Sequence, residues 1–136
     1  MIGDVAAWDA FISAHRWAVL TTLRAGGQPN SSVVAYAREA DELVISTPGG
    51  TFKRLSIEAD GRVNLCVISN AEPFNFVAIE ALAEVTRVGL EASTRAVFAN
   101  IADTGWSVPQ DLDGWLEAQQ RVILRLTPQR VYGVIR

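Results

Sequence analysis

Cysteine and histidine are almost absent from this chain of 136 residues, which contains one of each. With Cys66 alone, the chain cannot form an intrachain disulfide or a zinc site built from thiolates. With His15 alone, Ser-His-Asp and Cys-His catalysis are poorly supported, and no metal site is expected. The side chains therefore offer little covalent chemistry of their own. If the protein is an enzyme, a cofactor is expected to carry the reaction.

Charge is also scarce. Charged residues make up 20% of the chain, hydrophobic residues 49%, and the formal net charge is −3. Without a basic face, neither nucleic acid nor an anionic membrane is favoured as a partner. No apolar run approaches the ~18 residues of a membrane span, and no basic segment precedes an apolar one at the N-terminus. We therefore expect a cytoplasmic protein. The sparse surface charge also indicates that another subunit covers part of the surface.

Lys53 is the only lysine among the 12 basic residues. It lies in the segment 46–54, after two glycines at 49–50 and among three hydroxyl side chains, where a strand pattern gives way to a helix pattern. Free backbone N–H groups, hydroxyl donors, a helix N-terminus and a flexible cation together suit a phosphate. The alternative is a simple helix N-cap at Thr51, followed by a solvated pair of Lys53 and Arg54.

The length predicts one domain over residues 1–136. Alternating apolar residues and turn signals predict mostly consecutive strands in the first half, decorated by helices. This order favours a small barrel. The expected strands are 17–23, 30–36, 42–46, 62–68, 74–88, 122–126 and 130–135. The expected helices are a short one capped by Asp4, one at 51–59, one at 90–102, and one that starts at Asp111 or Asp113.

Three strand patterns carry more specific expectations. The segment 62–68 is almost continuously apolar, which predicts burial on both faces. The segment 74–88 has apolar residues on both faces, so we expect it to bend and to change neighbours along its length. Pro128 separates the last two strands, where it indicates a kink or a sheet edge.

Four segments in order carry a family resemblance. They are the hairpin strand 17–24 followed by Gly-Gly-Gln-Pro, the segment 30–36, the loop 46–54 before 60–63, and the closing segments 121–124 and 131–133. Together they resemble the split-barrel superfamily typified by pyridoxamine 5′-phosphate oxidase, and within it the branch of probable F-420-dependent enzymes. The resemblance covers about Trp17 to Val134. It implies a mainly β fold, a six- or seven-stranded antiparallel split β-barrel of the FMN-binding type with flanking helices.

The resemblance also implies a homodimer with a cofactor site at the subunit interface. The phosphate would lie near Lys53 and Thr51, with Ser46 or Thr47 donating beside them and Arg54 either assisting or facing solvent. The flat ring would lie against Ser31, Ser32, Val33 and Val34. Phe74, Asn75 and Phe76 would come from the other subunit or form the pocket wall, and for Phe76 ordinary core packing is an equal alternative.

The implied cofactor is F-420, with FMN as the alternative. Several relatives have an arginine where this chain has Thr51 and a polar amide where it has Val33. With fewer cations, the protein is expected to bind the acidic tail of F-420 more weakly.

The leading functional prediction is an oxidoreductase that exchanges hydride between this cofactor and a small unsaturated or aromatic substrate. No residue is assigned as catalytic, because Ser32, Tyr36 and Tyr132 suit structural roles better. A flavin or deazaflavin storage protein and a plain interaction domain remain as alternatives.

Overall fold

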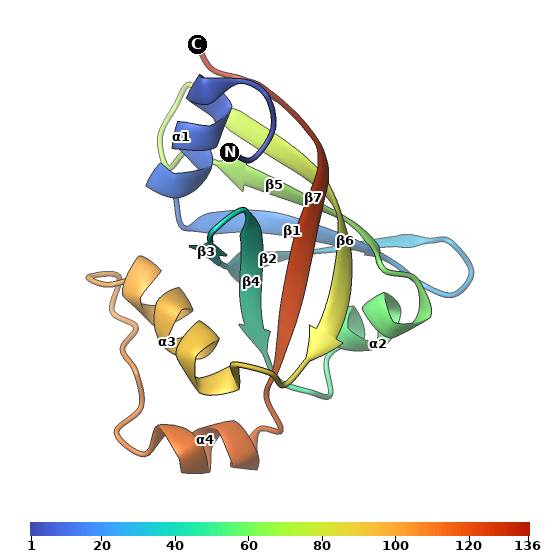
Figure 1. Ribbon diagram of the computed structural model, residues 1–136, viewed down its shortest axis with the longest axis vertical. Helices are drawn as coiled ribbons and strands as arrows, with labels where there is room; N and C mark the ends of the chain where they lie inside the picture. The colour runs from blue at the N-terminus through green and yellow to red at the C-terminus, as the bar shows by residue number, and fades with distance from the viewer.

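A computed structural model describes residues 1–136 and contains a single sheet of seven strands with four helices (Figure 1). The strands are β1 (Trp17–Leu23), β2 (Pro29–Ala35), β3 (Ala37–Glu39), β4 (Glu42–Thr47), β5 (Arg62–Ile68), β6 (Phe76–Thr86) and β7 (Val122–Val134). The helices are α1 (Ala6–Ala14), α2 (Phe52–Ala59), α3 (Leu90–Asn100) and α4 (Leu112–Ala118). None of the four helices has the length and hydrophobicity needed to cross a bilayer.

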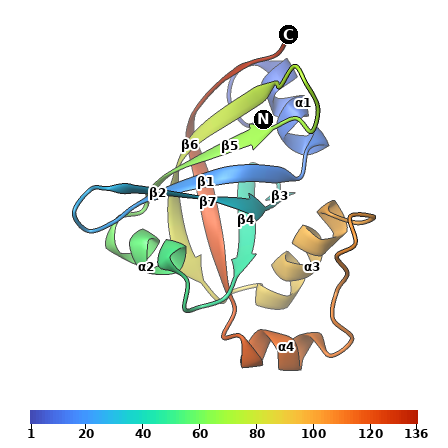
Figure 2. The same ribbon diagram turned by 180° about the vertical axis from the view of Figure 1, so that it is seen from behind.

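The strands pair in the order β2-β1-β5-β6-β7-β4-β3, and every pair is antiparallel. The sheet curls, so that β1 and β2 cross behind the long strands β6 and β7 in Figure 1 and in front of them in the reverse view of Figure 2. The expected split barrel with flanking helices is therefore confirmed.

β6 bends as the sequence predicts. It pairs with β5 only from Phe76 to Leu82, but with β7 as far as Thr86, and the register against β7 shifts between Glu80 and Ala81. Such a bulge adds local twist, which helps a sheet to curl around its core.

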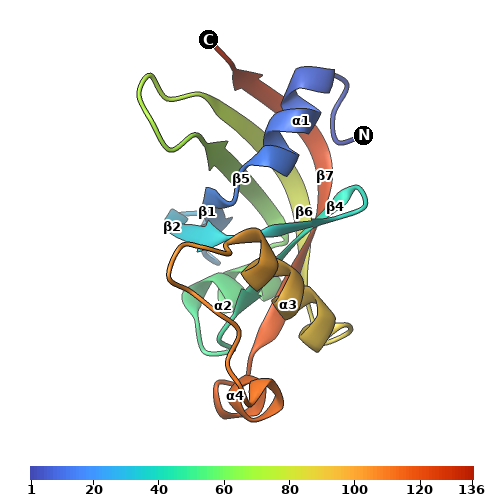
Figure 3. The same ribbon diagram turned by 90° about the vertical axis from the view of Figure 1, so that its left-hand side faces the viewer.

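The core lies inside the curl. Leu20, Leu43, Leu65, Ile79 and Leu124 are all fully buried there, each from a different strand. α1 covers the end of the curled sheet near both chain termini, whereas α2 and α4 lie toward the opposite end (Figure 1). α3 packs against the sheet on the side of β3 and β4 (Figure 3), where Val97 meets Val44 and Ile123.

Several sequence predictions are corrected. The two expected closing strands are one strand, β7, which passes through Pro128. β4 pairs only with Leu126 and earlier residues of β7, so the edge of β7 near Pro128 has no second strand to bond. Asp4 does not cap the first helix, whose N-cap is Val5. Glu39 belongs to a further short strand, β3, that the sequence did not suggest.

β5 is also buried differently from the prediction. Val63, Leu65 and Val67 are buried, but Asn64, Cys66 and Ile68 on the opposite face are only half-buried. The chain therefore buries only one of the two faces of this strand.

A buried hydrogen bond attaches α1 to the sheet. Tyr36 is fully buried, and its hydroxyl donates to the carbonyl oxygen of Ile12 at 2.6 Å. We expect Tyr36→Phe to lower the free energy of unfolding by about 1–2 kcal/mol, because it leaves a buried carbonyl without a donor. Tyr132→Phe is the matched control, since its hydroxyl accepts only a 3.3 Å bond from Asn64 in a half-buried position. Urea unfolding of both variants measures this difference, and equal losses would contradict it.

Candidate cofactor-binding site

The loop between β4 and α2, just before Lys53, contains two glycines with different surroundings. Gly49 is buried, its N–H donates to the Gln119 carbonyl at 3.4 Å, and a side chain there would collide with the carbonyl of Gln120. Gly50 is exposed and has open space around it. Gly49 therefore fixes the loop against the segment after α4, whereas Gly50 keeps the space beside Lys53 open.

Two cavities meet at Lys53. The first, which we call the aromatic cavity, has a volume of about 330 Å³ and is lined mainly by apolar side chains. The second, the hydroxyl cavity, has a volume of about 380 Å³ and a mostly polar lining. The aromatic cavity is lined by Trp17, Val33, Val34, Ala35, Ile45, Ser46, Thr47, Pro48, Lys53, Val97, Phe98, Ile101, Trp106, Trp115 and Arg121. The hydroxyl cavity is lined by Thr22, Asn30, Ser31, Ser32, Gly50, Thr51, Phe52 and Lys53.

Lys53 is a half-buried cation. Burial lowers the pKa of its ammonium group, and the positive charge of Arg121 lowers that pKa further. Neither Lys53 nor Arg121 forms an ion pair with a carboxylate. A desolvated cation without a counter-ion is unfavourable, so this position suits a bound anion.

Arg121 precedes β7 and is held by groups from two other elements. Its guanidinium lies 4.3 Å from the ring centroid of Trp115 in α4. Nη2 donates to the carbonyl and hydroxyl oxygens of Ser46 at 3.1 and 3.2 Å, and Nη1 donates to Gln119 at 3.0 Å. Nε is buried and has no acceptor in the protein. Burial lowers the pKa of this guanidinium as well.

The hydroxyl groups predicted to hold the phosphate lie around Lys53, but they already form hydrogen bonds within the protein. The Ser46 hydroxyl contacts the Thr94 hydroxyl at 3.0 Å in addition to Arg121. Thr51 occupies the N-cap position of α2 without capping it, and its hydroxyl donates instead to the Pro48 carbonyl at 3.1 Å. Thr47 is buried and lies 3.4 Å from the Thr51 hydroxyl. Thr51 therefore stands at the predicted N-cap position of α2, but its side chain does not cap the helix.

Arg54 points elsewhere. It forms an ion pair with Glu58 at 3.0 Å and donates to the Gly49 carbonyl at 3.1 Å. Its charge is therefore already compensated by the protein, in contrast to that of Lys53.

The predicted ring-binding segment lies on β2, an edge strand. One edge of β2 bonds β1 and the other has no strand partner, so the N–H and C=O groups on that free edge are available to a ligand. Ser31 and Ser32 line the hydroxyl cavity, and Val33 and Val34 line the aromatic cavity. The structure thus brings these four residues together with Lys53.

Phe74 and Asn75 are not part of this site within one subunit. They lie in the connection between β5 and β6, at the α1 end of the molecule, away from α2 (Figures 1 and 3). Asn75 accepts a bond from the Arg136 N–H at 2.9 Å, and the Phe74 carbonyl accepts from the Arg136 side chain at 2.6 Å. Of the two predicted origins, only a contribution from a second subunit stays open for this pair.

Sequence reasoning did not assign Arg121, Trp106 or Trp115 to the site. All three lie after β6 in the chain, and no spacing relates them to Lys53. The only hint of these residues in the sequence was its composition, with four tryptophans and a low fraction of charged residues.

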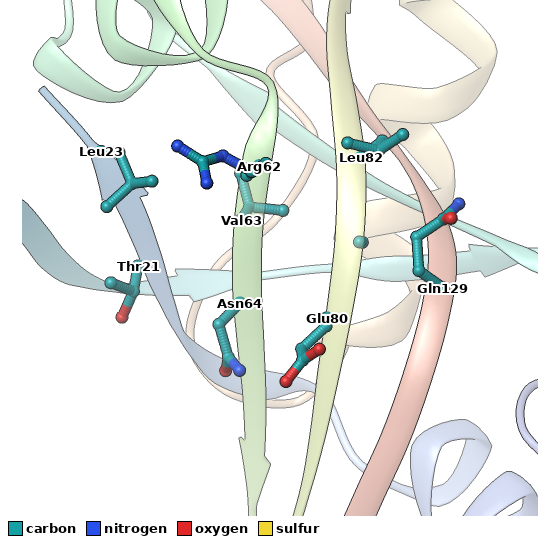
Figure 4. Close-up of a pocket in the computed structure, with 9 residues that line it drawn as sticks. Thr21, Leu23, Arg62, Val63, Asn64, Glu80, Leu82 and Gln129 are labelled. Carbon is teal, nitrogen blue, oxygen red and sulfur yellow. The ribbon is translucent and has the colours of Figure 1, made fainter. Parts of the chain in front are cut away.

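A third cavity, of about 440 Å³, lies against β1, β5, β6 and β7 (Figure 4). It is lined by Thr21, Leu23, Arg62, Val63, Asn64, Glu80, Ala81, Leu82 and Gln129. Its charged residues are already paired, Arg62 with Asp60 at 2.7 Å and Glu80 with Arg130 at 3.0 Å. It therefore offers an anion no unpaired cation, although it is the largest of the three.

The model of the family described as pyridoxamine 5′-phosphate oxidase matches residues 5–135. The chain belongs to this family. The resemblance inferred from the four sequence segments is therefore confirmed at the family level. No curated protein matches the sequence significantly.

Three solved structures show how widely the fold is shared. An F420 reductase matches with a TM-score of 0.76 and 18% identity, over 95% of this chain and 98% of that one. A FAD-binding protein from Mesorhizobium loti matches with a TM-score of 0.72 and 19% identity, over 98% and 95%. A heme storage protein from Vibrio cholerae matches with a TM-score of 0.69 and 18% identity, over 91% and 89%. At such identities, the matches establish the fold only.

The contrast between Lys53 and Arg54 can be measured. We expect Lys53→Met to leave the free energy of unfolding unchanged or to raise it, because the lowered pKa means that folding disfavours the charged ammonium. Arg54→Met, the control in the same helix, should lower that free energy by about 0.3–1 kcal/mol, because it removes an ion pair. Urea unfolding at neutral pH tests both. A larger loss for Lys53→Met would assign Lys53 a structural role.

Proposed function

We propose that the protein is a cofactor-dependent oxidoreductase that exchanges hydride between bound F-420, or alternatively FMN, and a small unsaturated or aromatic organic substrate. The observation that carries this proposal is the position of Lys53. It is a half-buried cation without a counter-ion, at the junction of an aromatic cavity and a cavity lined by hydroxyl groups.

The residues present fit such a cofactor. Lys53 and the hydroxyl group of Ser32 supply donors for a phosphate, and the Thr51 hydroxyl lies beside them but already donates to the Pro48 carbonyl. The aromatic cavity supplies flat apolar walls, and cavities of roughly 300–1,000 Å³ are typical of small-molecule sites. The free edge of β2 beside Val33 supplies backbone donors and acceptors for the polar edge of a ring.

Each group has a definable role in the reaction. The bound cofactor would supply the hydride chemistry. Lys53 and the hydroxyl groups would hold the phosphate and so fix the position of the ring. Trp17, Trp106 and Trp115 would exclude water and orient a flat substrate. Neither cavity is lined by a histidine, aspartate or glutamate, so we assign the transfer of any proton to solvent.

The arginines of the chain other than Arg121 bear on the choice of cofactor, since F-420 carries an acidic tail. Arg38 is bound to Asp9 and Asp41, Arg62 to Asp60 and Arg54 to Glu58. Arg24 is exposed, has no carboxylate partner and bonds Asn30, which lines the hydroxyl cavity. With so few free cations, F-420 is expected to bind with micromolar rather than nanomolar affinity.

Storage of a flavin or deazaflavin without turnover is the second candidate, since it would use the same site. The similarity to a heme storage protein raises heme as another ligand. Heme iron is usually held by histidine, cysteine, methionine or tyrosine. None of these lines either cavity in this subunit. His15 instead stacks on Phe11, and its Nδ1 bonds the Phe11 carbonyl at 2.8 Å. The residues of the site thus suit a flavin-type ligand better than heme.

Fluorescence titration with F-420 and with FMN, each at two ionic strengths, tests the cofactor. We expect F-420 to be preferred, with micromolar affinity that falls as salt screens its tail. Lys53→Ala should weaken binding roughly ten- to a hundredfold, because a charge-assisted phosphate contact contributes about 1.5–3 kcal/mol. Equal affinity in the variant and the wild type would overturn the role of Lys53. A clear preference for FMN would move the assignment to FMN.

We also propose a homodimer with the cofactor site at its interface. The outer face of the sheet carries a row of directly opposed residues across five strands: Val33, Val19, Cys66, Ala78 and Tyr132. A parallel row contains Ile68, Phe76 and Val134. Most of these side chains are half-buried or exposed, and Val33 is 71% exposed. Since Val33 also lines the aromatic cavity, a second copy on this face would reach the site.

Cys66→Arg places a charge at the centre of this outer face, at a position that the chain itself only half buries. We expect the wild type to have the mass of a dimer by light scattering at micromolar concentration, and Cys66→Arg to shift it toward the monomer mass of 14.8 kDa. Ala92→Arg, at an exposed position of α3, is the matched control and should leave the mass unchanged. A wild-type mass near that of the monomer would rule out the dimer.

A further inference from the structure

Lys53 and Arg121 differ from the paired basic residues of the chain. Six arginines form ion pairs with carboxylates: Arg38, Arg54, Arg62, Arg95, Arg125 and Arg130. Lys53 and Arg121 have no such partner, although both are half-buried and both line the aromatic cavity. In a chain with 15 acidic residues and a net charge of −3, two neighbouring cations without a carboxylate leave a local excess of positive charge.

We propose that Lys53 and Arg121 together bind one acidic group of the ligand, a phosphate or a carboxylate, where the aromatic cavity meets the hydroxyl cavity. This inference rests on the proposed function for the identity of the ligand and deepens it, since it adds a second cation to the same site. It also specifies the ligand class, namely a flat apolar ring system joined to an acidic group.

The contacts of Arg121 hold its guanidinium in place before a ligand arrives. Trp115 covers it at 4.3 Å, and Ser46 accepts two hydrogen bonds from Nη2. Nη1 uses one hydrogen on Gln119, which leaves its second hydrogen free for a ligand oxygen. Because Trp115 belongs to α4 and Ser46 to β4, both elements contribute to the position of this charge. Ser46 and Trp115 are therefore positioning residues for Arg121.

A merely structural arginine would join β4 to α4 through the same hydrogen bonds, so the test must detect charge rather than stability. Lys53 offers such a signal. As the only lysine, it gives a single side-chain NMR resonance when the protein is made with labelled lysine. Its pKa responds to every charge nearby, which includes Arg121 across the cavity and the paired Arg54 and Glu58 on its own helix.

The experiment titrates the Lys53 resonance in the wild type, Arg121→Gln and Arg95→Gln, with and without inorganic phosphate. Arg95 is a matched control, since it is an exposed arginine paired with Glu91 on α3. In the free protein, Arg121→Gln should raise the Lys53 pKa, because it removes a neighbouring positive charge. Phosphate should raise that pKa in the wild type and in Arg95→Gln. Its affinity for Arg121→Gln should fall about tenfold, and Arg121→Lys should restore part of the loss.

An unchanged Lys53 pKa in Arg121→Gln, or phosphate affinity equal to that of the wild type, would overturn the two-cation site. Titration of the same proteins with FMN and F-420 separates this inference from the proposed function. If the wild type binds phosphate through both cations but neither cofactor, the proposed function fails and the two-cation site stands. If Arg121→Gln binds the cofactors as the wild type does, the inference fails and the proposed function stands.

Discussion

The register between β4 and β7 is the constraint on which the candidate site depends. Ser46 lies opposite Ile123 and Thr47 opposite Val122, so the end of β4 lies beside the start of β7. The phosphate-loop candidate that follows β4 thereby meets Arg121, which immediately precedes β7. Gly49 strengthens the same contact, because its N–H bonds the Gln119 carbonyl and its missing side chain permits the close approach of Gln120. A slip of one residue in this pairing would turn Ser46 away from Arg121.

The two cations of the site lack the carboxylate partners that several arginines elsewhere have. Elsewhere, several arginines are matched with carboxylates close in sequence, as in the pairs of Arg95 with Glu91 within α3 and of Arg62 with Asp60 between α2 and β5. At the aromatic cavity, burial lowers the pKa of both Lys53 and Arg121, and the charge of Arg121 lowers the pKa of Lys53 further. Local conflicts of this kind are expected at functional sites, where stability is given up for binding.

The outer face of the sheet links the site to the proposed dimer. β5 has an apolar sequence typical of burial on both sides, yet the chain buries only the side toward its core. The uncovered side continues across β1 and β6 and ends at Val33, in the wall of the aromatic cavity. A dimer formed through this face would account for both the apolar pattern of β5 and the exposed apolar residue at the site. It would also allow Phe74 and Asn75 to reach a site in the other subunit.

The sequence by itself determined the local parts of this protein. The hairpin of β1 and β2, the bend of β6, the short helix after Gly49-Gly50 and the solitary Lys53 were all predictable, because turn residues, periodicity and composition act over a few positions. The order of these parts was also enough to indicate the family.

Only the tertiary structure decided what surrounds Lys53. Arg121 and Trp115 come from the far end of the chain, and they reach the site through strand register and helix packing, which leave no mark in local spacing. Arg54 stands next to Lys53 in sequence, yet the helix turns it toward Glu58, where its charge is neutralised. Likewise, Pro128 looked like a break between two strands, whereas the absence of a neighbour on that edge lets β7 continue through it. In each case the deciding factor is a partner distant in sequence.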